Sequence, residues 1–297
     1  MTVLVTGANG FVGTAVCSML EKRGTPFIGL VRKNALHARM CVGDLSSPEG
    51  LPHRNFQVAT AVVHCAAELP DGERTDFTKN VTITENLLNA LGKNVEIFVL
   101  LSSVSVYDPC DVTLEYDLTE DADELAQSGY GYSKLEQERL VTDWCQTHGV
   151  RFVILRASSI YGVGCRPTTL LPRICLAAVK NLPIELFAPA NYRQNFVCVK
   201  DVAGIACDAL NRTGVRGVFN LFSDDTFSAV ALANKVVSST GSTSNIVERE
   251  SNKMVPVVRF DNSRLHQTFQ PEFARFESEI RAYCNDLAST AMLKEST

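Results

Sequence analysis

Residues 2–21 read TVLVTGANGFVGTAVCSMLE, and this stretch decides the class of fold. Its first five residues, Thr2–Thr6, are apolar or β-branched, which predicts a strand buried on both faces. Three glycines spaced three apart follow, and Thr14–Glu21 then has the composition of a helix. A buried strand, a glycine turn and a helix in this order predict the first unit of an α/β fold with a doubly wound parallel sheet.

Each of the three glycines has its own physical use. Gly7 allows the chain to turn sharply out of the strand, and Gly10 lets a pyrophosphate approach the backbone because no side chain is in the way. Gly13 allows the helix to pack closely against the strand. The helix N-terminus offers unpaired N–H groups and a positive dipole end to phosphates. These features predict a dinucleotide site, and the alternative for this spacing is a plain tight turn.

The chain has 297 residues, of which 45% are hydrophobic and 21% charged, as in ordinary globular proteins. Its net charge of −5 provides no basic field that would attract nucleic acid. The apolar runs are too short to span a bilayer, and the first strand leaves no room for a signal peptide. The ten cysteines include no Cys-x-x-Cys pair. We therefore expect a cytoplasmic protein with reduced thiols, no metal, and no membrane or nucleic-acid partner.

The second predicted strand, Pro26–Val31, ends at the position that faces the adenosine ribose in dinucleotide folds. A carboxylate at that position would bind both ribose hydroxyls and favour NAD, but the sequence continues with Arg32 and Lys33. Arg32 can pair with a 2′-phosphate, so we expect NADP, with NAD as the alternative. The competing interpretation is that both basic residues belong to a solvated loop.

Small and polar residues follow the next two strands. Met40–Val42 predicts a third strand, and Asp44 is placed after it to accept a hydrogen bond from an adenine amino group. A fourth strand, Thr60–Ala67, ends in small residues at 65–67, which would let a flat cofactor lie against the backbone. His64 is expected to pack rather than to catalyse, because no acidic residue stands beside it in the sequence.

A polar patch follows the fifth predicted strand. Apolar residues recur at helical spacing over Asp76–Leu91, and Ile97–Leu101 predicts the strand. The stretch SSVSVY at 102–107 then lies at the carboxyl end of this strand, where open α/β sheets place their ligands. The acidic stretch 108–127 predicts a surface loop over that site, and Tyr130 to His148 predicts a helix.

Tyr130 and Lys134 stand four residues apart, so they share one face of this helix. A phenol with an ordinary pKa of about 10 is a poor base at neutral pH. A lysine ammonium one turn away is expected to stabilise the phenolate and lower that pKa. Tyr130 could then give a proton to a carbonyl oxygen or take one from a hydroxyl. Tyr132 points from another face of the helix and is expected to pack.

Six motifs occur together in an order that is typical of one enzyme family: TGANGFVG, HCAA, SSVSVY, YGYSK, LRASSIYG and NFVCVKDVA. Over roughly residues 1–215 the chain resembles the extended short-chain dehydrogenases/reductases, in their NAD(P)-dependent epimerase/dehydratase branch. The resemblance implies a Rossmann fold and hydride transfer coupled to proton transfer. It also implies a homodimer that pairs the helices at 76–91 and 130–148.

The resemblance implies roles for the residues that match. Tyr130 would be the catalytic acid or base, Lys134 would assist it and hold the nicotinamide ribose, and Ser103 would bind the substrate oxygen. Ser105 is a neighbouring candidate for substrate binding. The implied cofactor-binding residues are Gly7, Asn9, Gly10, Phe11, Val12, Gly13, Arg32, Asp44, Leu45, Cys65, Ala66, Ala67, Asn80, Lys134, Ala157 and Ser158.

Departures from the family pattern narrow the reaction. The family's dehydratases carry an Asp-Glu pair directly after the catalytic Ser or Thr, where this chain has Val104 and Ser105. Its epimerase-reductases carry a Cys there and a later His, where this chain has Val104 and Cys198. The reactions that remain are 4-keto reduction and 4-epimerisation of a nucleotide sugar. The alternatives are an NADPH-dependent reductase of a non-nucleotide carbonyl compound and a non-catalytic dinucleotide-binding sensor.

The second half predicts a smaller, discontinuous substrate-binding lobe. We expect the Rossmann domain to comprise 1–161 and 196–222, and the lobe to comprise 162–195 and 223–297. The expected elements are strands at 151–155, 184–187 and 218–222 and helices at 170–180, 201–211, 227–238 and 273–284.

Arginines of the lobe are candidate phosphate contacts. Arg166, Arg173 and Arg193 are the candidates for this role, and a surface arginine is an equal alternative for each. The arginine with which relatives grip a nucleotide diphosphate aligns with Gln194, and the following aspartate aligns with Asn195. This shift weakens the case for a nucleotide-sugar substrate without excluding it.

Overall fold

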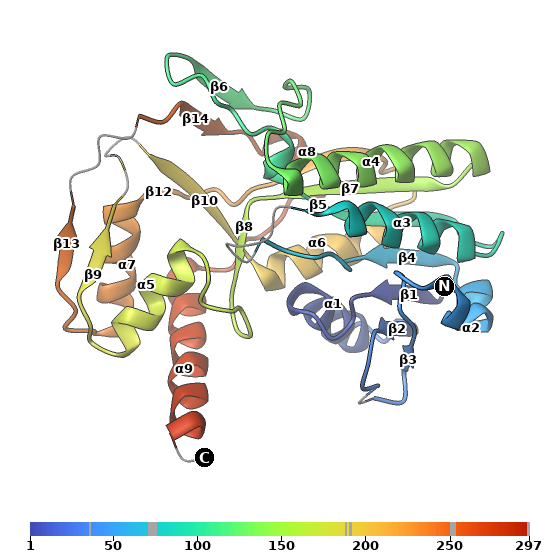
Figure 1. The fold of residues 1–297 in the computed structure, drawn as a ribbon, viewed down its shortest axis with the longest axis horizontal. Coiled ribbons are helices and arrows are strands. Elements are labelled where there is room, and N and C mark those ends of the chain that lie inside the picture. Colours follow the sequence, from blue (N-terminus) through green and yellow to red (C-terminus); the bar gives the residue numbers. More distant parts are fainter. Residues whose placement is uncertain (36, 71–75, 188, 190–191, 250–253, 296–297) are drawn as a thin grey trace.

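The structure is a computed structural model that describes residues 1–35, 37–70, 76–187, 189, 192–249 and 254–295, with side chains described as far as residue 290. A large sheet with helices on both faces forms one part of the molecule, and a smaller lobe of short strands and helices stands beside it (Figure 1). No helix in the described part of the chain is long and apolar enough to cross a membrane.

The central sheet is parallel throughout, which confirms the predicted fold class. Within the described residues its seven strands run in the order β11-β7-β5-β4-β1-β2-β3, so the strand order reverses between β1 and β4. Open α/β sheets bind their ligands at such a switch point. The strands are β1 (Val3–Thr6), β2 (Phe27–Val31), β3 (Met40–Val42), β4 (Ala61–His64), β5 (Ile97–Ser103), β7 (Arg151–Ala157) and β11 (Gly217–Leu221).

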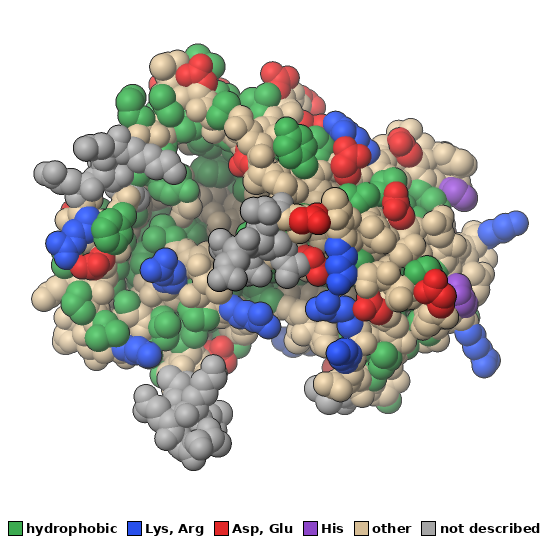
Figure 2. Space-filling view, in the orientation of Figure 1, with side chains coloured by type: hydrophobic (Ala, Val, Ile, Leu, Met, Phe, Trp, Pro, Cys, Tyr) green, Lys and Arg blue, Asp and Glu red, His purple; other side chains and the backbone are tan. Residues whose placement is uncertain are grey.

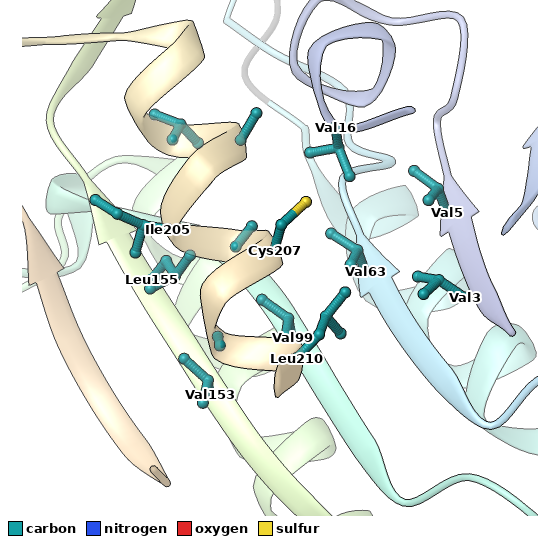
Figure 3. Packing of buried hydrophobic residues seen from close by; sticks show 14 of the residues in the cluster. Val3, Val5, Val16, Val63, Val99, Val153, Leu155, Ile205, Cys207 and Leu210 are labelled. Atoms are coloured by element: carbon teal, nitrogen blue, oxygen red, sulfur yellow. The ribbon is translucent and has the colours of Figure 1, made fainter. Parts of the chain in front are cut away.

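Helices cover both faces of this sheet. The pair α1 (Phe11–Lys22) and α6 (Val199–Asn211) packs on one face, and α3 (Thr78–Ala90) packs with α4 (Gly129–His148) on the other. Figure 3 shows strand valines such as Val63 and Val99 meeting Leu210 of α6 in a buried cluster. Burying one such side chain contributes about 1.5–3 kcal/mol to stability. The short helix α2 (His53–Val58) and the 3₁₀ turn η1 (Pro48–Gly50) also belong to this part.

The smaller lobe has a hydrophobic core of its own. In the described part of the lobe, a three-stranded sheet and a two-stranded sheet pack against three helices, with Leu171, Leu232 and Ile280 fully or almost fully buried between them. Its elements are β8 (Ser159–Tyr161), α5 (Leu170–Val179), β9 (Ile184–Leu186), β10 (Arg193–Cys198), β12 (Thr226–Ser228), α7 (Ala229–Thr240), β13 (Ile246–Glu248) and α9 (Phe276–Glu295).

The stretch 108–127 differs from the predicted surface loop. It contains a strand, β6 (Glu115–Leu118), which pairs in parallel with β14 (Val257–Phe260), and α8 (Ser263–Phe269) follows that partner strand. The loop prediction was therefore wrong over these four residues. The hydrogen-bonding partner of β6 lies far along the chain, so no local periodicity marks the strand.

Element ends also differ from the predictions where capping decides them. Helix α1 begins at Phe11 rather than at 14, because Gly10 is its N-cap and the helix starts directly on the glycine turn. Strand β4 ends at His64, so the small residues at 65–67 form a connection outside the sheet. The last helix begins at Phe276 and continues to Glu295, well beyond the predicted end at 284.

Candidate active site

The carboxyl ends of β1, β4 and β5 lie side by side at one edge of the sheet, together with the glycine turn (Figure 1). Gly7 has φ 64°, a left-handed conformation that suits glycine. A Cβ atom on Gly7 would lie 3.0 Å from the backbone of Ala66, and one on Gly13 would lie 2.1 Å from the Gly7 carbonyl oxygen. The turn, the start of α1 and the connection after β4 thus pack backbone to backbone.

The start of α1 fits the diphosphate of a dinucleotide. No side chain caps the helix, and its first turn carries no acidic residue. Among the described residues, the N–H groups of Phe11, Val12 and Gly13 have no hydrogen-bond acceptor. Free N–H groups at the positive end of a helix dipole bind phosphate oxygens. Asn9 and Gly10 are exposed on the same turn.

The predicted adenosine contacts lie after β2 and β3. Arg32 is exposed directly beyond β2. Asp44 follows β3, and hydrogen bonds from the Ser46 hydroxyl at 2.7 Å and N–H at 2.9 Å lower the pKa of its carboxyl, assisted by the nearby charges of Lys79 and Arg32. Leu45 is buried and accepts a hydrogen bond at its carbonyl from the Asn86 amide at 2.7 Å. Two of these residues, Arg32 and Asp44, are thus near enough to interact electrostatically.

The serine patch and the start of α4 approach each other closely. A Cβ atom on Gly131 would lie 2.4 Å from the Ser105 carbonyl oxygen, so glycine permits this contact. Ser103 ends β5 and caps the 3₁₀ turn η2 (Val104–Val106), and its hydroxyl donates to the Ser105 hydroxyl at 3.2 Å. Ala157 at the end of β7 pairs in register with Ser103. Helix α4 begins next to this turn, which brings the half-buried Tyr130 to the serines.

The pKa of Tyr130 differs from the expectation. Burial raises the pKa of its phenol to about 12, and a hydrogen bond with Ser103 lowers it only in part. The ring packs edge to face against Phe77, with centroids 5.4 Å apart. The expected lowering by Lys134 was wrong for this arrangement, because the Lys134 ammonium donates to the Leu101 carbonyl at 2.8 Å and to the Gln137 side chain at 3.0 Å. Tyr130 is thus a neutral acid at pH 7.

Lys134 is buried and has a perturbed pKa. Its side chain is 4% exposed, and burial lowers the pKa of the ammonium to about 8, opposed by the charge of Glu138.

Asn80 is fully buried beside the same helix, where its amide donates to the Ser133 hydroxyl at 3.1 Å and to the Glu68 carbonyl at 3.1 Å. The Asn80 amide oxygen also accepts from the Glu68 N–H at 2.7 Å. Asn80 therefore fixes the segment after the 65–67 connection.

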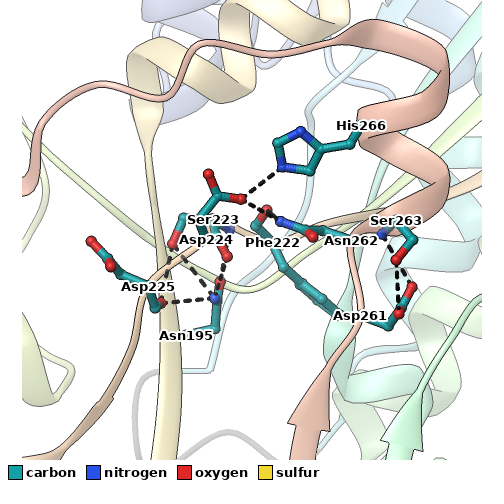
Figure 4. Close-up of polar contacts among 9 residues, drawn as sticks. All are labelled: Asn195, Phe222, Ser223, Asp224, Asp225, Asp261, Asn262, Ser263 and His266. Carbon is teal, nitrogen blue, oxygen red and sulfur yellow. Dashed lines mark hydrogen bonds and ion pairs between the residues drawn. The ribbon is translucent and has the colours of Figure 1, made fainter.

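Ser158 lies where the sheet meets the smaller lobe. Its hydroxyl donates to the Asn195 amide oxygen at 2.7 Å, and the Asn195 amide nitrogen donates to the carbonyls of Ser223 at 2.8 Å and Asp225 at 3.0 Å. Figure 4 shows Asn195 pointing into the turn formed by residues 222–225, where Asp224 also pairs with His266. The asparagine that departs from the family pattern is thus fully hydrogen-bonded.

A cavity of about 800 Å³ opens in the smaller lobe. Apolar side chains form most of its lining, including those of α5 and β9. The polar groups in the lining come from Arg173, Glu185, Tyr192 and Gln194. Figure 2 shows hydrophobic side chains gathered around a hollow on the side where β9 and α5 lie. Arg166 and Arg193 are exposed and do not line this cavity, so of the three candidate arginines the structure brings only Arg173 to it.

Two other expectations have clear outcomes. His64 is buried and hydrogen-bonded to Thr6 at 2.6 Å and to Thr84 at 3.0 Å, which agrees with a structural residue. Tyr132 is 55% exposed, so the expectation that it packs was wrong. Its face of α4 has no neighbouring element to cover it in the described part of the chain.

No group of three or more His, Cys, Asp or Glu side chains that could hold a metal ion occurs among the described residues.

Sequence reasoning missed Gln137, the hydrogen-bond partner of Lys134, and Tyr192, which lines the cavity. The helical period does place Gln137 one turn after Lys134, on the same face, and this was the signal available in the sequence.

Comparison with known proteins identifies the family of this chain. The model of the NAD dependent epimerase/dehydratase family matches residues 3–221, which span the glycine turn, Ser103, Tyr130 and Lys134. The chain belongs to this family. A member that it resembles over nearly its whole length is the dTDP-4-dehydro-6-deoxy-D-allose reductase of a Streptomyces species, 27% identical over 315 residues, or 95% of this chain and 96% of the relative. The UDP-glucose 4-epimerase of Vibrio cholerae is 24% identical over 75% of this chain and 70% of its own.

Solved structures of epimerases share the fold. The UDP-N-acetylglucosamine 4-epimerase from Bacillus cereus aligns with a TM-score of 0.84 at 24% identity, over 97% of this chain and 99% of its own. The UDP-glucuronic acid 4-epimerase from the same species, in complex with UDP-glucuronic acid and NAD, aligns with a TM-score of 0.82 at 22% identity, over 98% and 100% of the two chains. These likenesses establish the Rossmann architecture of the family for this chain.

Proposed function

We propose that this protein is an NADP(H)-preferring oxidoreductase or epimerase that carries out 4-keto reduction or 4-epimerisation of a nucleotide sugar. The observation that carries the proposal is the meeting of three side chains at one edge of the sheet. Ser103, Tyr130 and Lys134 gather at the carboxyl end of β5, beside a glycine turn that fits a diphosphate. Catalytic sites of this fold lie at that edge.

The proposed chemistry divides between the cofactor and the side chains. A bound nicotinamide supplies or accepts the hydride. The Ser103 hydroxyl binds the oxygen of the reacting carbonyl, and the Tyr130 phenol gives that oxygen a proton. A phenol with a pKa of about 12 is protonated at neutral pH, so it is ready to donate. This protonation state favours the reductive direction, and epimerisation would also need the reverse proton transfer.

The preference for NADP rests on the residues after β2. Arg32 offers a guanidinium that can form two parallel hydrogen bonds to a ribose phosphate. NAD is the alternative, because the similar epimerase structures hold NAD. We propose that the N–H groups of Phe11, Val12 and Gly13 would hold the phosphates of the cofactor, and that the 65–67 connection and Ser158 would contact its nicotinamide part.

The lobe supports a large substrate. A volume of about 800 Å³ is in the range of pockets that enclose ligands of nucleotide size. Arg173 supplies a cation for a phosphate, and the relatives act on UDP- and dTDP-sugars.

We further propose a homodimer that pairs α3 and α4, supported by the exposed Tyr132 on α4.

A second candidate is NADPH-dependent reduction of a carbonyl compound that carries no nucleotide. The uncharged Gln194 in the lining of the cavity, at the position where relatives have an arginine, favours this candidate. The oxidation of NADPH in the presence of keto-sugar nucleotides and of small ketones separates the two. Turnover with the first set alone supports the nucleotide sugar, and turnover with the second set alone supports the alternative.

Replacement of Tyr130 tests the catalytic assignment. Tyr130→Phe should lower kcat about 10²- to 10⁴-fold, because it removes the group that transfers the proton. Dinucleotide affinity, measured by fluorescence titration, should stay within about twofold of the wild type. Tyr132→Phe makes the same change on the exposed face of α4 and should keep full turnover. Full activity of Tyr130→Phe would remove the phenol from the mechanism. If the wild-type protein binds the cofactor but turns over no carbonyl compound, a dinucleotide-binding sensor would be supported instead.

A further inference from the structure

Lys134 ends a buried chain of hydrogen bonds that crosses four elements. Its ammonium donates to the amide oxygen of Gln137 at 3.0 Å, and Gln137 is 0% exposed. The amide nitrogen of Gln137 donates to the Thr84 hydroxyl at 2.6 Å and to the Asn80 carbonyl at 3.0 Å. Thr84 in turn contacts a ring nitrogen of His64 at 3.0 Å. The side chain of Gln137 is therefore held at both of its polar atoms.

The chain continues from His64 to the glycine turn. The other ring nitrogen of His64 lies 2.6 Å from the Thr6 hydroxyl, which also accepts the N–H of Ala66 at 3.2 Å. Thr6 is the last residue of β1 and directly precedes Gly7. Lys134 is thus connected through neutral groups to the turn that fits the diphosphate.

Among the described residues, Gln137 is the side chain that accepts a hydrogen bond from Lys134. The next carboxylate on the helix, Glu138, bonds to Arg156 at 2.7 Å and to Ser102. Lys134 itself uses one N–H for the Leu101 carbonyl at 2.8 Å and one for Gln137, which leaves the third donor of its ammonium for a ligand. The acceptor on Gln137 therefore decides where that third donor points.

We propose that Gln137 is a positioning residue for Lys134, because its amide oxygen holds the ammonium at a fixed place without adding a charge. This inference rests on the proposed role of Lys134 in binding the cofactor ribose and assisting Tyr130. A neutral amide oxygen stabilises an ammonium less strongly than a carboxylate would. The Gln137 amide therefore fixes the position of the Lys134 nitrogen, while burial keeps the pKa of the ammonium low.

The other groups that act on Lys134 are few. On α4 there is Glu138, at the end of β4 there is His64, and in the connection after β4 there is Cys65. Helix α3 faces the network with the neutral groups of Thr84 and Asn80, and β5 faces it with a backbone carbonyl. A change at residue 137 therefore alters the surroundings of Lys134 while these groups stay in place.

The test measures the titration of Lys134 in the protein without added cofactor. Lysine labelled with ¹³C at Cε reports the midpoint by NMR, and the Lys134 signal is the one lost in Lys134→Arg. We expect a wild-type midpoint of about 8. Gln137→Glu should raise this midpoint by about one unit or more, because a carboxylate favours the ammonium. Gln137→Met, of similar volume, should lower it, because the hydrogen bond to the charged form is lost.

A second measurement is the affinity for NADPH. Gln137→Met should weaken it about three- to tenfold, because the ammonium is no longer fixed. Gln146→Glu and Gln146→Met make the same changes on the exposed last turn of α4 and should leave both the midpoint and the affinity unchanged. Thr84→Val removes an anchor of the Gln137 amide and should shift the midpoint in the direction of Gln137→Met, whereas Thr84→Ser should not. These two variants keep the test available if a replacement at 137 prevents folding.

Unchanged midpoints in Gln137→Glu, Gln137→Met and Thr84→Val would overturn the proposal and leave Gln137 a merely structural residue. Because the titration is read on the protein at rest, its outcome is independent of the reaction. If Tyr130→Phe keeps full activity while the midpoints shift as expected, the catalytic assignment fails and the link between Gln137 and Lys134 stands.

Discussion

At the scale of single residues, the choice between the two dinucleotides depends on Arg32. Its guanidinium is exposed beyond the end of β2, and it acts on the carboxylate of Asp44. Arg32→Asp should weaken NADPH binding at least tenfold and bring NADH binding level with it or above it, because a carboxylate repels the 2′-phosphate and accepts hydrogen bonds from the ribose hydroxyls. Fluorescence titration with each dinucleotide measures the ratio of affinities.

The neighbouring Lys33 offers a matched comparison, since it is also exposed and carries the same charge. Lys33→Asp should change the ratio less than Arg32→Asp does, because a flexible ammonium lacks the bidentate geometry of a guanidinium. A ratio that stays constant in Arg32→Asp would show that the phosphorylated ribose is not recognised there.

Residues could be predicted from the sequence where the required geometry is local. Tyr130 and Lys134 share a face because a helix repeats every 3.6 residues, and the structure does place both on α4 beside Ser103. The pKa of Tyr130 could not be predicted, because its ring packs against Phe77, which precedes α3 and lies more than fifty residues away in sequence. The role of Gln137 likewise depends on Thr84, more than fifty residues away in sequence.

At the scale of elements, predictions held where burial is strong on both faces. The first strand was predicted over Thr2–Thr6 and is observed at Val3–Thr6, with all four residues buried. The short strands β6 and β14 were missed, because each is partly exposed and exists through its partner. β10 was missed for another reason: the segment 192–203 was interpreted through its family motif, although its inward residues from Asn195 to Cys198 are buried.

Asn195 of β10 joins elements of the sheet and the lobe, and this position requires a hydrogen-bond donor. It is 2% exposed, and its amide nitrogen lies beside two backbone carbonyls. Asn195→Asp would place a carboxylate oxygen against those carbonyls and lose two hydrogen bonds, so it should destabilise the fold by roughly 2–4 kcal/mol at pH 7. Urea unfolding followed by circular dichroism measures the loss.

The exposed Asn234 on α7 provides the control for this chemical change. Asn234→Asp should alter the free energy of unfolding by less than about 0.5 kcal/mol, as exposed substitutions usually do. Equal stabilities of Asn195→Asp and the wild type would show that the amide nitrogen is not needed as a donor.

At the scale of the whole molecule, polar contacts at α6 tie the hydrophobic core of the smaller lobe to the core between α6 and the sheet. Lys200 pairs with Glu279 of α9 at 2.8 Å. Both carboxylate oxygens of Asp201 accept the Ala274 N–H at 3.2 Å, at the start of the segment that leads into α9. Burial raises the pKa of Asp201 to about 6, with Glu279 adding to the rise and the Ala274 N–H and Lys200 opposing it. The junction therefore responds to pH.

Two groups give the folded state opposite responses to acid. Below pH 6 the folded protein takes up a proton on Asp201 before the unfolded chain does, so this group adds stability as the pH falls to about 4. Burial, assisted by the charge of Lys134, lowers the pKa of His64 to about 3, so the unfolded chain takes up that proton first and stability is lost as the pH falls from 6.5. Between about pH 4 and 6 the two contributions largely cancel.

Asp201→Asn removes one of these contributions while keeping an oxygen that can accept the Ala274 N–H. At pH 7 the variant should be more stable than the wild type by about 1–2 kcal/mol, a value reduced because the carboxylate is partly exposed to water. From pH 6 to 4 its free energy of unfolding should fall more steeply than that of the wild type, by up to about 1.4 kcal/mol per pH unit, because the loss at His64 is no longer offset.

Urea unfolding at pH 4, 5, 6 and 7 measures both curves, and Asp143→Asn on the exposed face of α4 should run parallel to the wild type. A difference between Asp201→Asn and the wild type that is the same at pH 4 and 7 would mean that the Asp201 carboxyl does not titrate differently on folding, and the pH response would then belong to other groups.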